Sequence, residues 1–380
     1  MTAERAARLR VQAPDGATFL ASSAPNVRWL SGLAGEPHVT YGMAQLWVVA
    51  GPGGQRILAP AGELAWIDEQ GRLDEDVIPH GRFVLRGAPP APVAAGVVRG
   101  WSFADALAAA LDAVGAGELL VADDGLAASR LDGLRADLAP RRLTVDPAPF
   151  VAARAVKDAA ELDVLRRVNR LAEDGIRAAL DVAAAGITER RLLHEVRRSM
   201  LDGGARPMLG SVGVAERGAL VDFPVSDRVL APGEVIRFDV GATLDGYHAD
   251  LARTAVLGPP PAWAAEAYAA VLAGEQAALD IVRPGVTGEE LFDAAVAATR
   301  AAGLPDYERT HCGHGIGLEM YEPPSVAPRS GRPLAAGTTL CLETPLYLAG
   351  QAGIQVEDAI VITADGYERL GAMSRDLVVV

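Results

Sequence analysis

Four acidic residues in the second half of the chain stand in segments whose side chains alternate between apolar and polar. Asp239 lies between the apolar Phe238 and Val240, so a strand in this segment turns the carboxylate away from the apolar face. The same alternation recurs at three further acids, Asp250, Glu343 and Glu357. We therefore expect four carboxylates on the sides of strands whose other sides are buried.

Carboxylates that converge in a partly buried place need a counter-charge, because repulsion and burial both raise their pKa. These strands contain no lysine, and the sequence offers the four acids no evident basic partner. Divalent cations are therefore the expected counter-charge, with a nitrogen ligand at His314, where flanking glycines let the backbone approach closely. Four carboxylates and one imidazole suit two ions such as Mn, Co, Zn or Fe, which activate a hydroxide for attack on a carbonyl.

The second half of the chain also repeats itself. Gly186-Ile-Thr and Gly285-Val-Thr each open a helical run, and the repeat continues into the acidic segments. Acid matches acid at two aligned pairs of positions, Asp239 with Glu343 and Asp250 with Glu357. We expect two half-domains, each helical and then stranded, whose pairing about a pseudo-twofold axis brings the four carboxylates together.

The first part of the chain alternates strand-like and helical runs, which is typical of an α/β domain. The pattern predicts a helix at 103–114 and strands at 45–49, 56–58 and 119–122.

The pattern changes at Asp158, which forms a capping box with Glu161 ahead of apolar residues at helical spacing. We predict the domain boundary just before this helix, with an amino-terminal α/β domain over 1–152 and an α+β catalytic domain over 153–380.

Composition excludes several classes of partner. The 380 residues include 35 Lys and Arg against 49 Asp and Glu, a net charge of −14 that disfavours nucleic acid and anionic membranes. No apolar stretch suits a signal peptide or a membrane span, so a cytoplasmic protein is expected. Cys312 and Cys341 are too few and too far apart for a disulfide framework or a structural zinc site. Buried free thiols beside the metals are the favoured interpretation for both, and metal ligation is the alternative.

The acids and the histidine resemble the ligand set of the pita-bread metallopeptidases, which include prolidases, Xaa-Pro aminopeptidases, methionine aminopeptidases and creatinase. The resemblance rests on order and spacing: Asp239, Asp250 eleven residues later, His314 within Gly-His-Gly-Ile-Gly, Glu343 29 residues later and Glu357 14 residues after that. The segment 26–33, Asn-Val-Arg-Trp-Leu-Ser-Gly-Leu, is similar to the creatinase-type N-terminal domain. The resemblance covers the whole chain and implies an α/β N-terminal domain and a pita-bread C-terminal domain.

The resemblance also implies roles for the five residues. Asp239 would bind one metal ion, His314 and Glu343 the other, and Asp250 and Glu357 both. Glu343 is also counted among the catalytic residues. A homodimer is implied as well, in which the amino-terminal domain caps the cleft of the partner and restricts the enzyme to short substrates.

The chain departs from the family in the substrate site. Asp222 stands where proline-specific members carry a substrate-binding histidine, and Tyr321 stands where peptidases carry a second histidine. Ser325 and Gln355 stand where prolidases place arginines for the carboxylate of a dipeptide. We therefore expect weak activity on Xaa-Pro dipeptides, a preference for a neutral or cationic amide, and a Tyr321 hydroxyl that points into the cleft.

Two further histidines lie close to the ligands in sequence. His248 resembles a residue of the methionine aminopeptidases and shares a strand face with Asp250, so a catalytic role and a structural hydrogen bond both fit. His311 is interpreted as a scaffold residue.

The favoured function is a dinuclear metal-dependent hydrolase that cleaves an amide bond in a small peptide, similar to an Xaa-Pro aminopeptidase or dipeptidase. One alternative is a C–N hydrolase of a small non-peptide metabolite, similar to creatinase or ectoine hydrolases. A non-catalytic binding protein on the same fold is the other, but such proteins usually lose ligands and all five are present here.

Overall fold

The computed structural model describes residues 2–14, 16–33, 46–84, 97–99, 101–221 and 223–380. The chain divides into two compact units, Met1–Arg154 and Ala155–Val380. Asp222, one of the expected site residues, lies outside the described residues, as does Gln45 at the start of a predicted strand.

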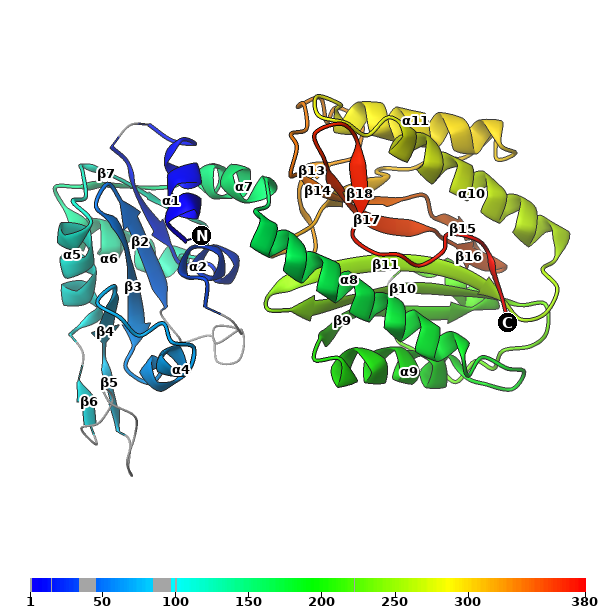
Figure 1. Ribbon diagram of the computed structural model, residues 1–380, viewed down its shortest axis with the longest axis horizontal. Helices are drawn as coiled ribbons and strands as arrows, with labels where there is room; N and C mark the ends of the chain where they lie inside the picture. Colours follow the sequence, from blue (N-terminus) through cyan, green and yellow to red (C-terminus); the bar gives the residue numbers. More distant parts are fainter. Residues whose placement is uncertain (1, 15, 34–45, 85–96, 100, 222) are drawn as a thin grey trace. The chain divides into compact units, whose positions relative to one another are not determined.

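The described part of the first unit is built on a six-stranded mixed sheet in the order β4-β3-β2-β1-β7-β8 (Figure 1). Its strands are β1 (Thr18–Ala21), β2 (Trp47–Gly51), β3 (Gly54–Pro60), β4 (Val77–His80), β7 (Leu119–Ala122) and β8 (Arg142–Val145). Its helices are α1 (Thr2–Arg10), α2 (Ala24–Ser31), α4 (Leu64–Glu69), α5 (Phe103–Ala113), α6 (Ala128–Leu138) and α7 (Ala148–Ala155). A separate pair, β5 (Arg82–Val84) and β6 (Val97–Arg99), forms a two-stranded sheet.

The elements predicted in this unit are present. The strand predicted at 119–122 is β7, the strand at 56–58 lies inside β3, and the helix at 103–114 is α5. The strand predicted at 45–49 is β2, shifted toward the carboxyl end. Leu20, Val49 and Leu111 pack into one buried cluster, which is why the alternation of apolar residues revealed the strands.

The segment 26–33 has a structural role within the first unit. Asn26 donates to the buried carboxylate of Asp123 and accepts from the Arg154 guanidinium at 2.7 Å. Asp123 also accepts hydrogen bonds from Ser22 and Ser23. A fully buried carboxylate is tolerated here because its oxygens are satisfied by these donors.

The described residues of the second unit form a nine-stranded sheet whose main path runs β13-β12-β14-β17-β11-β10-β9, with β18 beside β17 and β19 beside β11. The strands of the first half are β9 (Arg206–Val214), β10 (Val235–Leu244) and β11 (Tyr247–Val256). Those of the second half are β12 (Gly313–Gly315), β13 (Glu322–Ser325), β14 (Thr339–Glu343), β17 (Glu357–Ile362), β18 (Tyr367–Arg369) and β19 (Val378–Val379). β15 (Leu346–Leu348) pairs separately with β16 (Ala352–Ile354), and a short 3-10 helix η1 spans Ala215–Ala219.

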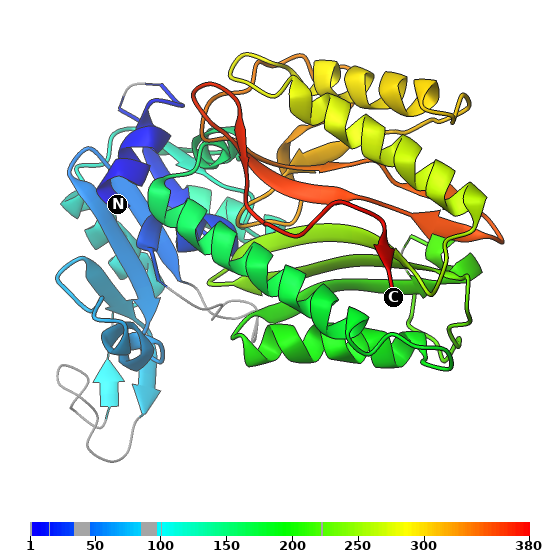
Figure 2. The same ribbon diagram turned by 45° about the vertical axis from the view of Figure 1, so that its right-hand side comes forward.

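Two helix pairs cover this sheet. α8 (Ala159–Leu180) and α9 (Glu189–Asp202) lie along β9, β10 and β11, and α10 (Ala262–Asp280) and α11 (Gly288–Ala301) lie along the second half (Figure 2). Phe238, Val240 and Leu251 belong to the apolar cluster beneath α8 and α9, and Leu342 belongs to the one beneath α10 and α11. The alternation predicted from the sequence therefore leaves the opposite face of the sheet to the acids.

The internal repeat is confirmed in the structure. Thr188 and Thr287 are the N-caps of α9 and α11. Two residues before each of them lies a glycine, Gly186 with φ 92° and Gly285 with φ 93°, in a backbone conformation that L side chains rarely adopt. The halves meet where β11 pairs with β17. The predicted capping box of Asp158 is also present at the start of α8.

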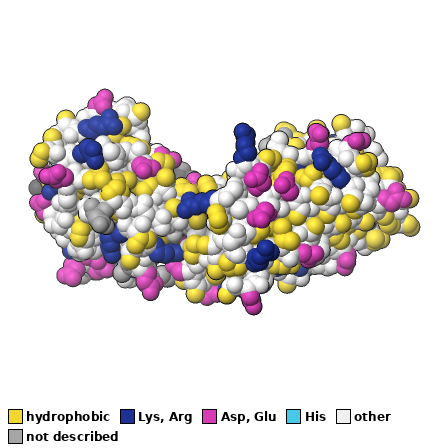
Figure 3. Space-filling model, turned by 90° about the horizontal axis from the view of Figure 1, so that it is seen from above, with side chains coloured by type: hydrophobic (Ala, Val, Ile, Leu, Met, Phe, Trp, Pro, Cys, Tyr) yellow, Lys and Arg dark blue, Asp and Glu magenta, His cyan; other side chains and the backbone are white. Residues whose placement is uncertain are grey.

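Charges of both signs are mixed on the molecular surface. Figure 3 shows acidic and basic side chains interspersed among hydrophobic ones on the face it presents. None of the helices formed by the described residues has the length and apolar character needed to cross a membrane.

Candidate metal centre

Strand register brings three of the predicted ligands together. Asp239 on β10 lies opposite Ala252 on β11, Ala252 lies opposite Glu357 on β17, and Glu357 lies opposite Glu343 on β14. Residues directly opposite in a sheet share a face, and Asp250, two residues before Ala252, shares it too. Asp239, Asp250 and Glu357 each place a carboxylate oxygen within 4.8 Å of the others.

His314 comes to the same place from β12. It pairs with Cys341 on β14, and its ring, the Cys341 thiol and the Glu357 carboxylate also lie within 4.8 Å of one another. The Nδ1 atom lies 3.0 Å from the Gly315 carbonyl oxygen, which fixes the ring orientation. Nε2 lies 3.7 Å from Asp250 Oδ2 and has no hydrogen-bond partner among the described residues, so it is available to bind a cation.

Glu343 lies in the same cavity with its oxygens already bonded. One accepts from His311 Nε2 at 3.0 Å and the other from Gln355 Nε2 at 3.2 Å. The group of close donor atoms around His314 contains Cys341 and Glu357 but not Glu343. Burial and the neighbouring carboxylates raise the pKa of the Cys341 thiol well above the usual value, and the side chain is a free thiol. Burial raises the pKa of Cys312 to about 12, and it is also a free thiol.

The electrostatics of the acids differ. Burial, followed by the charges of Asp239 and Glu343, raises the pKa of Asp250, and burial with the charge of Asp250 raises that of Glu357. Burial also acts on Glu343, but the His311 hydrogen bond and the charge of Arg309 prevail and lower its pKa. Asp250 and Glu357 thus need a neighbouring cation more than Glu343 does.

The expectation that the acids have no basic partner is wrong for two of them. Arg237, on β10 two residues before Asp239, places Nη1 3.1 Å from the Asp239 carboxylate. His311 contacts Glu343, as described above. The cation is an arginine on the same strand face as its acid, and the absence of lysine from these strands did not exclude it. Within the described part of the chain, neither Asp250 nor Glu357 forms an ion pair with an arginine or lysine.

The acids line a cavity of about 360 Å³. Its described lining consists of Val221, Asp239, Asp250, Arg309, Thr310, His311, Met320, Tyr321, Glu343, Tyr347, Gln355 and Glu357. His311, expected to be a scaffold residue, is part of the wall. Its signal in the sequence was proximity to His314, which did not indicate on which side of the strand it lies.

Tyr321 stacks on His314, with ring centroids 3.8 Å apart and an interplanar angle of 26°. The side chain is 62% exposed, so one side of the ring covers the histidine and the rest faces solvent. Partial burial of the hydroxyl, and then the charge of Asp250, raise its pKa, so the phenol remains a hydrogen-bond donor.

Two other predicted positions, His248 and Ser325, are not among the described lining residues, and a third, Gln355, lines the cavity with its side chain already bonded to neighbouring residues. His248 places Nδ1 3.3 Å from the carbonyl oxygen of Gly317 and is not part of the lining. Ser325 is exposed and pairs with His314 across β12 and β13. Gln355 is buried, accepts from Arg237 at 2.8 Å and donates to Glu343 and Glu357.

A second polar network holds Glu357 from behind the sheet. Arg253, which is fully buried, donates from Nη1 to the Glu357 carbonyl oxygen at 2.7 Å and from Nη2 to Asp358 at 2.8 Å. Arg369 donates to the same Asp358 oxygen at 2.9 Å. These bonds fix the backbone from which the Glu357 carboxylate projects.

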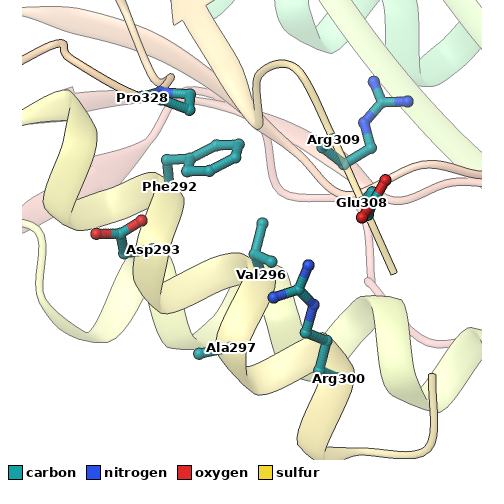
Figure 4. Close-up of a pocket in the computed structure, with 8 residues that line it drawn as sticks. All are labelled: Phe292, Asp293, Val296, Ala297, Arg300, Glu308, Arg309 and Pro328. Carbon is teal, nitrogen blue, oxygen red and sulfur yellow. The ribbon is translucent and has the colours of Figure 1, made fainter. Parts of the chain in front are cut away.

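Tyr347 and Arg309 were not predicted. The guanidinium groups of Arg237 and Arg309 lie 5.1 Å and 5.5 Å, respectively, from the centroid of the Tyr347 ring. Arg309 also borders a second pocket of about 530 Å³ beside α11, shown in Figure 4. The only signal for Arg309 was its place five residues before His314.

Comparison with known proteins agrees with this geometry. The profile of metallopeptidase family M24 matches residues 163–364, which include all five predicted ligands. An Xaa-Pro dipeptidase of Pyrococcus furiosus is 29% identical over 226 residues, 59% of this chain and 65% of that protein. A probable dipeptidase PepE of Mycobacterium tuberculosis is 31% identical over 230 residues, 60% of this chain and 61% of that protein. The matched region thus spans less than two thirds of these relatives.

Solved structures match over nearly the whole chain. The X-Pro aminopeptidase from Thermotoga maritima has a TM-score of 0.82 at 24% identity and covers 99% of this chain and 100% of its own. The dipeptidase PepE from Mycobacterium ulcerans has a TM-score of 0.79 at 26% identity and covers 100% of this chain and 97% of its own. The resemblance to the pita-bread metallopeptidases is confirmed at the level of fold and family. The chain belongs to metallopeptidase family M24.

Proposed function

We propose that this protein is a metal-dependent hydrolase that cleaves an amide bond in a small peptide of the Xaa-Pro type. The observation that carries the proposal is the convergence of Asp239, Asp250 and Glu357 in one cavity, with the free Nε2 of His314 beside them. The names of the relatives, Xaa-Pro dipeptidase and dipeptidase, support the same activity.

The side chains present fit divalent cations. Asp250 Oδ1 and His314 Nε2 are both buried, and no described residue forms a hydrogen bond with either atom, which is costly unless another ligand satisfies them. Carboxylate oxygens with one imidazole suit Mn, Co, Zn or Fe. We propose that two ions are held by Asp239, Asp250, His314, Glu343 and Glu357. When bound, such ions polarise a carbonyl and make water nucleophilic at neutral pH.

The other residues have proposed roles around this centre. Glu343 and His311 share a hydrogen bond across which a proton can move, so Glu343 is the proposed proton acceptor. The Tyr321 hydroxyl is the proposed donor to the substrate carbonyl. His248 positions the glycine-rich segment through Gly317, and Asp222 is proposed as a pocket residue.

The size of the cavity favours a short substrate. About 360 Å³ accommodates a small ligand but not a folded chain. We also propose a homodimer, whose amino-terminal units restrict the length of the peptide. Sedimentation as a monomer at micromolar concentration would contradict this assembly.

A C–N hydrolase of a small non-peptide amide is the second candidate. Gln355 favours it, because it stands where prolidases place an arginine, and its neutral amide donates to Glu343 and Glu357 and brings no charge for the carboxylate of a dipeptide.

The test is turnover of a panel of Xaa-Pro dipeptides, longer peptides and metabolite amides after loading with Mn, Co or Zn. We expect dipeptides to be cleaved and chelation to abolish turnover and to lower the melting temperature, since an ion that binds only the native state stabilises it. Cleavage of metabolite amides alone would support the second candidate. No metal uptake and no effect of chelation would contradict both.

A further inference from the structure

Three side chains that carry or can carry positive charge lie at the cavity or contact its acids: Arg309 and His311 line it, and Arg237 contacts Asp239. Two of the three are already bonded to acids. Arg237 is fully buried and donates to Asp239, to Gln355 and to the Leu220 carbonyl oxygen. His311 is bonded to Glu343. Arg309 differs from both, because it forms no ion pair with any carboxylate of the described residues.

Arg309 is nevertheless held in place. Its guanidinium lies 5.5 Å from the centroid of the Tyr347 ring, and its Nε lies 3.4 Å from the His311 carbonyl oxygen, close to the limit for a hydrogen bond. In Figure 4 the guanidinium points away from α11, the helix that carries Arg300. Arg309 also lines the acidic cavity, and its Nη donors form no hydrogen bond with the described residues, so they are available to a ligand there.

Such a group suits one class of ligand. A guanidinium is permanently charged and planar, and its parallel N–H bonds match the two oxygens of a carboxylate. The acids repel an anionic group elsewhere in the cavity. A negatively charged group of the substrate is therefore expected to bind next to Arg309.

We propose that Arg309 binds the free carboxylate of the substrate, which makes the substrate a dipeptide or N-acyl amino acid with its carboxylate next to the scissile amide. This inference rests on the proposed amide hydrolase function and narrows its substrate class. It also replaces the expectation of a neutral or cationic substrate. That expectation followed from the missing arginines at Ser325 and Gln355, whereas Arg309 enters the cavity from the segment that precedes His314.

The first test compares a substrate with its uncharged counterpart. The kcat/KM of Mn-loaded protein is measured for Ala-Pro and for its carboxamide in the wild type, Arg309→Gln and Arg309→Lys. We expect the wild type to prefer the free acid by about 10- to 100-fold, as for a charge-assisted hydrogen bond. Arg309→Gln should lose this preference through a raised KM for the acid alone, and Arg309→Lys should retain part of it.

Arg300→Gln is the matched control. Arg300 shares the pocket of Figure 4 with Arg309, but it donates to the Tyr307 carbonyl oxygen and does not line the acidic cavity. The Arg300→Gln variant should prefer Ala-Pro over its carboxamide by the same factor as the wild type. An equal effect of the two substitutions would overturn the proposal.

The second test measures binding without turnover. Calorimetric titration with proline and with prolinamide should show tighter binding of proline, by a similar factor, that disappears in Arg309→Gln. If no amide is cleaved but this difference is found, the hydrolase proposal fails and the role of Arg309 stands. If both Ala-Pro and its carboxamide are cleaved equally and proline has no advantage, the hydrolase stands and the role of Arg309 is wrong. Absence of both turnover and carboxylate preference overturns both.

Discussion

The two halves of the second unit share a backbone plan but differ in the residue two positions before each acid. Residues two apart on a strand share a face, so these side chains flank the carboxylates. They are Arg237 before Asp239 and His248 before Asp250 in the first half, and Cys341 before Glu343 and Gln355 before Glu357 in the second. The first half therefore supplies a permanent cation from its strand, whereas the second supplies neutral groups.

The cations of the second half come from elsewhere. His311 and Arg309 belong to the segment that leads into β12 and approach Glu343 from the side. A repeated backbone thus delivers four acids in symmetric rows, while unrepeated side chains decide how each acid is neutralised. This asymmetry gives the two proposed metal positions different surroundings.

The largest effect is expected where the halves meet. Asp250→Ala and Glu357→Ala remove carboxylates proposed to bridge both ions, so metal content should fall below one ion per chain. Activity should fall by about 10³-fold or more, equal to ~4 kcal/mol of transition-state stabilisation. Metal analysis and kcat/KM measure both effects. The control is Asp365→Ala, an exposed acid in the turn after β17, which should retain metal and activity.

Replacing the flanking residues tests the comparison directly. Arg237→Met removes the buried donor that serves Asp239, Gln355 and the Leu220 carbonyl oxygen, so the free energy of unfolding of the chelated protein should fall by about 3–5 kcal/mol. Cys341→Ala, its counterpart in the other half, removes only a buried thiol and should lower it by about 1 kcal/mol. Denaturant unfolding with and without Mn measures both. Equal losses would show that the two flanking positions are equivalent.

Two buried glutamates, one on a helix that covers each half, differ in how they should make the stability of the fold depend on pH. Glu173 on α8 accepts from the backbone N–H groups of Ala372 and Met373, whereas Glu275 on α10 accepts from Arg375 and leaves Oε1 without a partner. Burial, and then the charge of Asp358, raise the pKa of Glu275 from 4.5 to about 8.

The sign of the effect follows from linkage. Because the folded state binds the Glu275 proton more tightly than the unfolded state, this group stabilises the fold below about pH 4.5, and the contribution is lost as the pH rises toward 8. The unfolding free energy of chelated wild type should therefore fall between pH 5 and 8, by at most about 1.4 kcal/mol per pH unit from this group. Glu275→Gln should flatten that slope. A slope unchanged from wild type would mean that Glu275 is ionised throughout this range.

The smallest effect is expected at Tyr321. Tyr321→Phe keeps the ring that stacks on His314 and removes only the hydroxyl, so kcat should fall about tenfold with metal content unchanged. Tyr321→Ala is the companion variant, because it removes the stacking as well. If the phenylalanine variant lost metal as readily as the alanine variant, the tyrosine would act on the metal site and not on the substrate.

The acids, the repeat and the helix starts could be predicted from the sequence because they depend on local patterns. Alternation along Phe238, Asp239 and Val240 fixes which side of a strand is apolar, and the capping residues Asp158 and Thr287 satisfy N–H groups only three residues away. These features need no knowledge of what lies on the next strand.

Tertiary structure alone decided which charges meet. The row from Asp239 through Ala252 and Glu357 to Glu343 depends on the register of four strands separated by up to about a hundred residues of chain. One irregular segment brings His311 to Glu343 and Arg309 to the wall of the cavity, and no periodicity encodes its path. Hydrophobic alternation is a property of neighbours in the chain, whereas ion pairing in a sheet is a property of register, and so the acids were predictable and their cations were not.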